Sequence, residues 1–148
     1  KRKGQQQVSR EIVSGEQGRV RSEQQRVVDE KPHRKLKLWQ ASMDFVVELY
    51  KELKNFPDYE RFGLVAQLQR AAVSVPSNLA EGAARKNTKE LLQFLYIARG
   101  SLSEIDTQLE IAFRVGHLEK PVYVRLSERL QEISKMLSGL IASIAKQT

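Results

Sequence analysis

The sequence contains no cysteine and only two histidines, His33 and His117. The lack of cysteine excludes disulfide bonds, thiolate zinc sites, iron–sulfur clusters and cysteine nucleophiles. Two histidines far apart in the sequence also exclude a histidine-rich metal site. We therefore expect neither a metal nor a cofactor, and the composition fits a reducing cytoplasm.

Long apolar runs are missing as well. The longest span only a few residues, whereas a membrane helix needs about 18. Lys1, Arg2 and Lys3 are basic, but no apolar segment follows them, so no secretory signal is expected. These absences predict a cytoplasmic protein without a membrane-spanning helix.

Positive charge is in excess and is unevenly distributed. The 148 residues carry a formal net charge of +7, with 41% hydrophobic and 29% charged residues, a composition typical of one globular domain. Residues 1–35 hold ten Lys/Arg and five Asp/Glu, whereas residues 36–148 hold fifteen and thirteen. Such a basic segment favours contact with nucleic acid or another polyanion. The alternative is a solvated, disordered tail.

Residues 1–34 are predicted to form a flexible basic arm. Gly4, Gly15 and Gly18 interrupt any helix there, and large apolar residues are few. Pro32 marks the boundary, and the folded domain is predicted over residues 35–148.

From residue 35 onward, apolar residues recur at three- and four-residue steps, which is typical of amphipathic helices. Four helices are predicted, at about 37–54, 59–85, 88–115 and from Pro121 onward. The core stripe expected for the first helix is Trp39, Met43, Val46, Tyr50 and Leu53, widened by Phe45 and Leu49. The stripes expected for the other three helices are Leu64, Leu68, Ala71/Ala72, Val75 and Leu79; Leu91, Leu95, Ala98, Leu102, Ile105, Leu109 and Ala112/Phe113; and Leu126, Leu130, Ile133, Leu137, Leu140/Ile141 and Ile144. No segment alternates with period two. The predicted fold is an all-α, antiparallel up-and-down four-helix bundle.

Several residues predict how these helices begin, end and bend. Asn87 or Thr88 is expected to cap the third helix and Gly116 to end it. Pro121 suits the first turn of the fourth helix. Pro76 lies inside the second helix, where the apolar phase is preserved on both sides. The second helix is therefore predicted to be kinked but continuous.

The second helix also has a second apolar side, formed by small residues: Ala66, Val73, Ala80 and Ala84. A helix that is apolar on two sides has something packed on both. This side either contacts another subunit, which makes these residues oligomer-interface candidates, or fills tight packing inside the bundle.

A polar stripe separates the two apolar sides of the second helix. Its members are Gln67, Arg70, Ser74, Glu81 and Arg85, with Asn78 at the edge. An ion-pair ladder is expected among Arg70, Glu81 and Arg85. The serines and Asn78 either supply hydrogen bonds to carbonyls freed by Pro76 or belong to a functional polar groove.

No motif indicates an enzyme. Walker A, GxGxxG, HExxH and GxSxG patterns are all missing. His117 has no second ligand nearby in the sequence, so a solvated loop histidine is expected. Gly100 lies inside the third helical pattern, where glycine costs about 1 kcal/mol relative to alanine, and it is expected to permit a close helix crossing. We therefore expect a non-enzymatic protein.

The segment from Lys31 to about Gly116 resembles a known bacterial family. The matching stretches are KPHRKLKLWQASMDFVVELYK and FPDYERFGLVAQLQRAAVSVPSNLAEGAARKNTKELLQFLYIARGSLSEID. The string RAAVSVPSNLAEG is the most specific, because a proline after Ser-Val inside a helical pattern is unusual. On these strings the chain is similar to the four-helix-bundle proteins encoded within intervening sequences of 23S ribosomal RNA genes. The C-terminal helix matches by pattern only.

The resemblance implies a bundle that assembles as a homopentamer and is suspected of binding RNA. A related family with the same bundle, the accessory variability determinants of diversity-generating retroelements, forms basic pentamers that engage nucleic acid and a reverse transcriptase. We therefore expect a homo-oligomer that binds structured RNA such as ribosomal RNA. The RNA-binding candidates are Arg70, Arg85, Lys86, Lys89, Lys35 and Lys37.

The expected mechanism is electrostatic, because Lys and Arg neutralise phosphates and release counterions. The densest basic cluster of the folded part is residues 85–89, with a solubilising loop as its alternative. Trp39, Tyr50 and Phe94 fall in or near apolar stripes, so few exposed aromatic residues are expected. Recognition of RNA shape or backbone is thus favoured over base stacking. The alternative function is an oligomeric adaptor that binds a partner protein.

Overall fold

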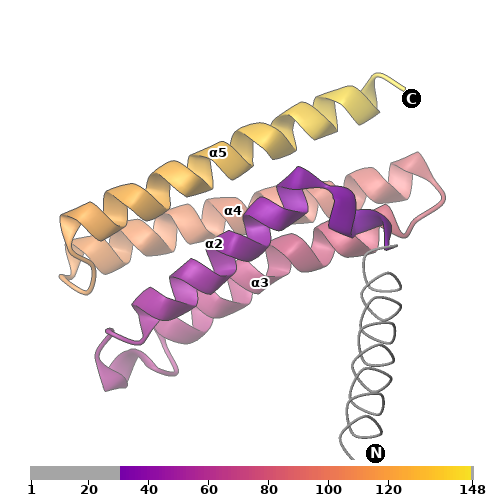
Figure 1. Ribbon diagram of the computed structural model, residues 1–148. Helices are drawn as coiled ribbons and strands as arrows, with labels where there is room; N and C mark the ends of the chain where they lie inside the picture. Colours follow the sequence, from indigo (N-terminus) through magenta and orange to yellow (C-terminus); the bar gives the residue numbers. More distant parts are fainter. Residues whose placement is uncertain (1–30, 148) are drawn as a thin grey trace, which may run out of the picture.

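The computed structural model describes residues 31–147, which are helical apart from short connections (Figure 1). The elements in chain order are η1 (Pro32–Lys35), α2 (Lys37–Leu53), η2 (Asp58–Glu60), α3 (Leu64–Ala83), α4 (Thr88–Arg114) and α5 (Lys120–Ala145). No strand occurs in residues 31–147, and no helix there combines the length and apolar character needed to cross a membrane. Residues 1–30 of the predicted arm lie outside the described residues, and the predicted boundary at residue 35 falls within η1.

Consecutive helices run in opposite directions and pack side by side (Figure 1). α3 packs against α2 and α4, and α5 packs against α4 and α2, so each helix contacts two neighbours around one core. The connections at residues 84–87 and 115–119 are short, which forces sequential helices to be neighbours. Residues 59–63, the start of the predicted second helix, belong instead to η2 and a turn. The predicted antiparallel four-helix bundle is confirmed.

Leucine and isoleucine at helical spacing form most of the core. The largest fully buried apolar side chains are Leu49, Leu68, Leu79, Leu95, Ile105, Leu109, Leu126 and Leu137. Burying one such side chain contributes about 1.5–3 kcal/mol relative to leaving it in water. Most residues of the core stripes predicted for the second, third and fourth helices are buried, and Leu91, Phe113, Leu140 and Ile144 are half-buried against the core.

The stripe predicted for the first helix is wrong in part: Phe45, Leu49 and Leu53 are buried as predicted, but its other members are not. The core-facing residues of α2 are Leu38, Phe45, Leu49 and Leu53. Met43 and Tyr50 of the predicted stripe are 38% and 39% exposed, and Trp39 and Val46 are half-buried. Because α2 is apolar around much of its circumference, residue spacing fits two faces. The face that carries leucine and phenylalanine enters the core.

The ends of the helices follow the predicted signals. Asn87 caps α4, because its side-chain Oδ1 accepts a hydrogen bond of 2.7 Å from the backbone N–H of Lys89. Gly116 follows α4 with a φ of 87°, a conformation that glycine adopts at little cost. Pro121 lies in the first turn of α5, and α3 continues through Pro76 as one helix.

A close approach of helices occurs at Gly82 and not at Gly100, where it was expected. A Cβ atom on Gly100 would meet nothing within 4 Å. A Cβ atom on Gly82 would lie 3.0 Å from Leu91 Cδ1 and 3.1 Å from Phe94 Cβ. The end of α3 therefore packs so closely against the first turns of α4 that a Cβ atom at position 82 would crowd Leu91 and Phe94.

Candidate nucleic-acid interface

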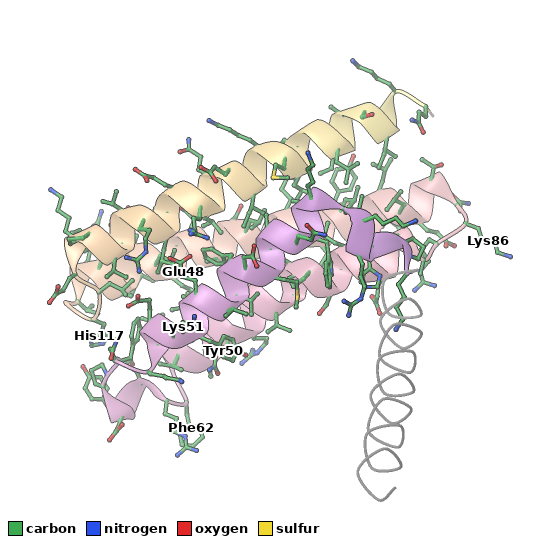
Figure 2. The ribbon with its side chains drawn as sticks, viewed as in Figure 1. Glu48, Tyr50, Lys51, Phe62, Lys86 and His117 are labelled. Carbon is green, nitrogen blue, oxygen red and sulfur yellow. The ribbon has the colours of Figure 1, made fainter. Side chains whose placement is uncertain are left out.

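Five of the predicted RNA-binding residues gather at one end of the bundle. α2 begins, α3 ends and α4 begins at this end (Figure 1), and Lys86 projects outward from the loop between α3 and α4 (Figure 2). We name as the basic end the exposed residues Lys35, Lys37, Arg85, Lys86 and Lys89. The exposed carboxylates of Glu81 and Glu90 lie within a turn or so of this loop, so cations outnumber anions there.

The α3–α4 loop holds one of its cations against an aromatic ring. The Arg85 guanidinium carbon lies 4.9 Å from the centre of the Phe94 ring, a favourable cation–π arrangement. The ion-pair ladder expected with Arg70 and Glu81 does not form within residues 31–147. α4 also begins here, and the partial positive charge of a helix N-terminus favours an anion.

η1 lies at the basic end and is held against the first turn of α2. The His33 ring packs on Trp39 with 5.0 Å between centroids, and the Arg34 guanidinium lies 5.2 Å from the same ring. Gln40 Nε2 donates a hydrogen bond of 2.9 Å to the carbonyl of Arg34. Desolvation, together with the positive charges of Arg34 and Lys31, lowers the pKa of His33 below its usual 6.5. His33 is therefore neutral at pH 7 and adds no charge to this end.

Arg70 lies apart from the basic end. It is thirteen residues before the last residue of α3, about 20 Å along the helix axis. Its exposed side chain lines an open groove of about 470 Å³ between α3 and α4. This α3–α4 groove is lined by Phe62, Gln67, Arg70, Ala71, Ser74, Ile97, Ser101, Glu104 and Gln108.

The polar residues around Pro76 connect α3 to α4. Asn78 Nδ2 donates to the Ser74 carbonyl at 2.7 Å and to Ser74 Oγ at 2.9 Å. A further hydrogen bond joins Ser74 Oγ to Ser101 Oγ at 2.8 Å. Pro76 has no N–H, so the carbonyl that lacks its helical donor is that of Ala72. Asn78 donates to Ser74 and not to this carbonyl. Of the polar stripe, Gln67, Arg70 and Ser74 therefore line the α3–α4 groove, and Ser74 also bridges α3 to α4.

The expectation that few aromatic residues are exposed is wrong. Tyr59 and Phe62 are 76% and 88% exposed, and Phe62 projects from the turn between α2 and α3 (Figure 2). Both lie in a turn bounded by Pro57 and Gly63, outside every helical stripe. That position was the available sequence signal for their exposure. Gln108 carried no such signal, because one wall of its groove is formed by residues of α3 that are far from it in the sequence.

His117 is not the solvated loop residue that the sequence predicted. Its side chain is 9% exposed, and Nε2 lies 3.5 Å from Glu60 Oε2 and 3.4 Å from the Tyr59 hydroxyl. The Phe56 ring lies 5.6 Å away. These partners come from the turn between α2 and α3, which the up-and-down topology brings beside the α4–α5 loop. His117 thus joins two turns at the end of the bundle opposite Lys86 (Figure 2).

Comparison with known proteins places this bundle in a family. The family whose sequence model matches, over residues 34–139, is described as 23S rRNA-intervening sequence protein. The chain belongs to this family. Its structure is similar to the crystal structure of a protein of unknown function from the S23 ribosomal protein family of Bacteroides thetaiotaomicron. The two chains are 22% identical with a TM-score of 0.67, over 71% of this chain and 95% of that chain, a likeness that shows the fold alone. No curated protein matches the chain.

This member of the 23S rRNA-intervening sequence protein family exposes an apolar surface on α3. The predicted interface residues Ala66 and Ala80 are half-buried, Val73 is 41% exposed, and Ala84 is exposed just after the last residue of α3. The second apolar side of the helix is therefore only partly covered by the rest of the bundle. It stays available to a neighbour.

α2 extends this apolar surface. Met43, Val47 and Tyr50 are 38%, 51% and 39% exposed and recur at helical spacing. Tyr50 lies two residues, about 200° around the helix, from Glu48, which pairs with arginines of α5. Figure 2 places Tyr50 on the side of α2 away from α5. We name as the α2–α3 face the residues Met43, Val47, Tyr50, Ala66, Val73 and Ala80.

A second groove, of about 650 Å³, lies between α4 and α5 of this family member. Its ionisable residues Arg99, Asp106 and Glu128 are exposed, as are Arg70 and Glu104 of the α3–α4 groove. Catalytic acids and bases usually have pKa values shifted by burial or by a close charged partner. Neither groove supplies a buried pair of that kind.

Proposed function

We propose that the protein is a non-enzymatic RNA-binding protein whose basic end holds the phosphates of structured RNA such as ribosomal RNA. The observation that carries the proposal is the gathering of Lys35, Lys37, Arg85, Lys86 and Lys89 at one end of the bundle. The description of its family, 23S rRNA-intervening sequence protein, supports ribosomal RNA as the proposed target. An RNA partner of this kind places the protein in the cytoplasm.

The proposed mechanism depends on more than one copy of the chain. The basic end of one bundle offers five cations, and phosphate contacts act together through counterion release. In a homo-oligomer, the pentamer that the family resemblance implies, several basic ends bind one RNA and raise the effective concentration of every contact. The exposed α2–α3 face supports a contact between copies, since large exposed apolar patches mark interaction sites.

The test is RNA affinity across a salt series, with a ribosomal RNA stem–loop and a duplex DNA of the same size. The first variant combines Arg85→Gln, Lys86→Gln and Lys89→Gln at the basic end. The control combines Lys51→Gln, Lys54→Gln and Lys120→Gln, exposed cations at the other end. The two variants lose the same charge at opposite ends of the bundle, and the basic-end variant also loses the contact of Arg85 with the Phe94 ring.

We expect the wild type to prefer the RNA and to lose affinity steeply as salt rises. The basic-end variant should bind at least about tenfold more weakly, and its salt slope should fall by about 0.7–0.9 for each lost phosphate contact. The control should stay close to the wild type. Equal weakening of both variants, or equal affinity for RNA and DNA, would reduce the interaction to general electrostatics and overturn the proposal.

A second candidate function is an oligomeric adaptor that binds a partner protein. It is favoured by the apolar character of the α2–α3 face. Apolar docking responds little to salt, whereas phosphate binding falls steeply. A partner retained at high salt by a protein that binds no RNA would support the adaptor over the RNA-binding function.

A further inference from the structure

We infer that the α3–α4 groove is a binding site for an unpaired nucleobase of the RNA, an inference that rests on the RNA-binding function proposed above. The basic end addresses phosphates and carries no means of reading a base. The α3–α4 groove combines an exposed aromatic ring, amide groups and balanced charge in one open cavity. Each of these features points to a flat, polar, uncharged ligand.

The groove has the dimensions and lining of a small-ligand site. Its volume of about 470 Å³ falls inside the range of roughly 300–1,000 Å³ typical of such sites. α3 contributes one wall and α4 the other, and the Ser74–Ser101 hydrogen bond joins the two walls. The helices and this bridge hold the cavity open without a ligand.

Phe62 supplies a stacking surface at the end of the groove. It is 88% exposed, more than any other large apolar side chain that the structure describes. The turn that carries it is held by backbone hydrogen bonds from Arg61 N–H to the Asp58 carbonyl, 3.1 Å, and from Gly63 N–H to the Glu60 carbonyl, 3.0 Å. Arg61 lies 5.4 Å from the Phe62 ring. An ordered, exposed aromatic ring beside a cation is the usual platform for an unpaired base.

Gln108 supplies an unused hydrogen-bond acceptor. Its side-chain Oε1 is buried and has no hydrogen-bond partner, and a buried acceptor left without a donor is unfavourable. Because Oε1 is shielded from solvent, the Gln108 side chain has to rotate toward the groove to accept from a base. The exocyclic amino groups of adenine, cytosine and guanine are donors of the required kind. Gln67 lines the same groove and offers a second amide.

The charge of the groove distinguishes it from the basic end. Arg70 and Glu104 are both exposed and both line it, so one cation is balanced by one anion. A phosphate would gain from Arg70 and lose to Glu104, whereas a neutral base gains a donor from one and an acceptor from the other. The nucleobase therefore fits the groove better than the sugar–phosphate backbone does.

The test uses two RNAs of equal length: a hairpin whose unpaired loop carries 2-aminopurine, and a blunt duplex without unpaired bases. The full-length variants are Phe62→Ala, which removes the ring, and Gln108→Leu, which removes the acceptor and keeps the side-chain size. The control is Tyr96→Ala, because Tyr96 is a 44% exposed aromatic residue of α4 that does not line the groove. Oligomer mass is measured for every variant.

We expect the wild type to bind the hairpin more tightly than the duplex and to quench the 2-aminopurine. Phe62→Ala and Gln108→Leu should each weaken hairpin binding by about fivefold or more. Duplex binding, oligomer mass and the behaviour of Tyr96→Ala should stay unchanged.

Four outcomes would overturn the inference. An unchanged preference for the hairpin in Phe62→Ala removes the stacking role. A lower oligomer mass in Phe62→Ala assigns the ring to a contact between copies. The wild type could bind both RNAs equally and still lose affinity when the basic end is substituted. That result would refute the nucleobase site but would support the proposed function. A wild type that binds neither RNA refutes both.

Discussion

Gly82 and Gly100 both lie inside helices, but close packing requires a glycine only at position 82. The missing side chain at Gly82 lets α3 approach Leu91 and Phe94 of α4, and a Cβ there would be 3.0 and 3.1 Å from their atoms. Phe94 also holds the Arg85 guanidinium. The close approach at Gly82 thus positions one cation of the basic end as well as closing the bundle.

This difference predicts opposite effects of two alanine substitutions. Gly100→Ala should raise the free energy of unfolding by about 0.5–1 kcal/mol, since alanine restricts the unfolded chain and meets no neighbour. Gly82→Ala gains the same helix propensity but forces the Cβ of Phe94 to move, and crowding in a packed interior costs about 1–3 kcal/mol. Urea unfolding measures both. A stabilised Gly82→Ala protein would contradict the crowding assigned to this site.

His117 shows how a residue gains partners that its sequence neighbours do not suggest. Its contacts, Glu60 and Tyr59, are more than fifty residues away in the chain. They meet because antiparallel helices bring the α2–α3 turn beside the α4–α5 loop. The same turn carries Phe62, so the His117 contacts also steady the surface that we propose as a stacking platform.

At the scale of whole elements, α2 and α5 are joined by an ion-pair cluster as well as by the core. Arg125 donates to Glu48 at 2.7 Å and to Glu52 at 2.8 Å, and Arg129 lies 2.9 Å from Glu48. The hydrogen bond that Arg125 donates to Glu48 is the main cause that raises the pKa of Arg125 above its usual value. Glu48 lies on the side of α2 that faces α5 (Figure 2).

Glu48→Gln removes the charge that both arginines share and nearly keeps the shape. We expect a lower melting temperature at low salt and a smaller difference at high salt, because these arginines are half-exposed and salt screens exposed pairs. Glu132→Gln on α5 is the control, since Glu132 is exposed and forms no ion pair within the described part of the chain. A deficit that does not change with salt would show that packing, and not charge, joins α2 to α5.

Much of the fold was predictable because helix signals are local. Three core stripes, the cap at Asn87, the stop at Gly116 and the continuity through Pro76 depend on residues within a few positions of each other. The phase of α2 was not predictable in this way. Met43 and Tyr50 have the right spacing, and only competition with the leucine face for one core decides which side is buried.

The candidate site, like the fold, was predictable only where it depends on residues that are close in the sequence. The cluster at residues 85–89 is contiguous in the sequence, and antiparallel helices bring Lys35 and Lys37 to the same end. Arg70, the sixth predicted RNA-binding residue, lies away from this end in the α3–α4 groove. The unpaired acceptor of Gln108 depends on burial between two helices, a property that no local pattern encodes.

At the scale of the whole molecule, charge and apolar surface are placed on different parts of the bundle. The basic end is the terminal surface where α2 begins and α4 begins, whereas the α2–α3 face runs along the sides of two helices. Copies that pack through their sides leave their ends free. An assembly built through the α2–α3 face would therefore keep its basic ends exposed to RNA.

This arrangement predicts that one carboxylate on the α2–α3 face separates the copies. Val73→Glu and Ala80→Glu should lower the mass measured by light scattering after size exclusion, because an unpaired charge is costly to bury. Far-UV circular dichroism should stay helical, and RNA affinity should fall as multivalency is lost. Val124→Glu on α5 is the matched control, since Val124 is 40% exposed and Val73 is 41% exposed. Val73→Glu with the wild-type mass would refute the α2–α3 face as the contact between copies. An unfolded Ala80→Glu protein would assign Ala80 to the packing of the bundle itself.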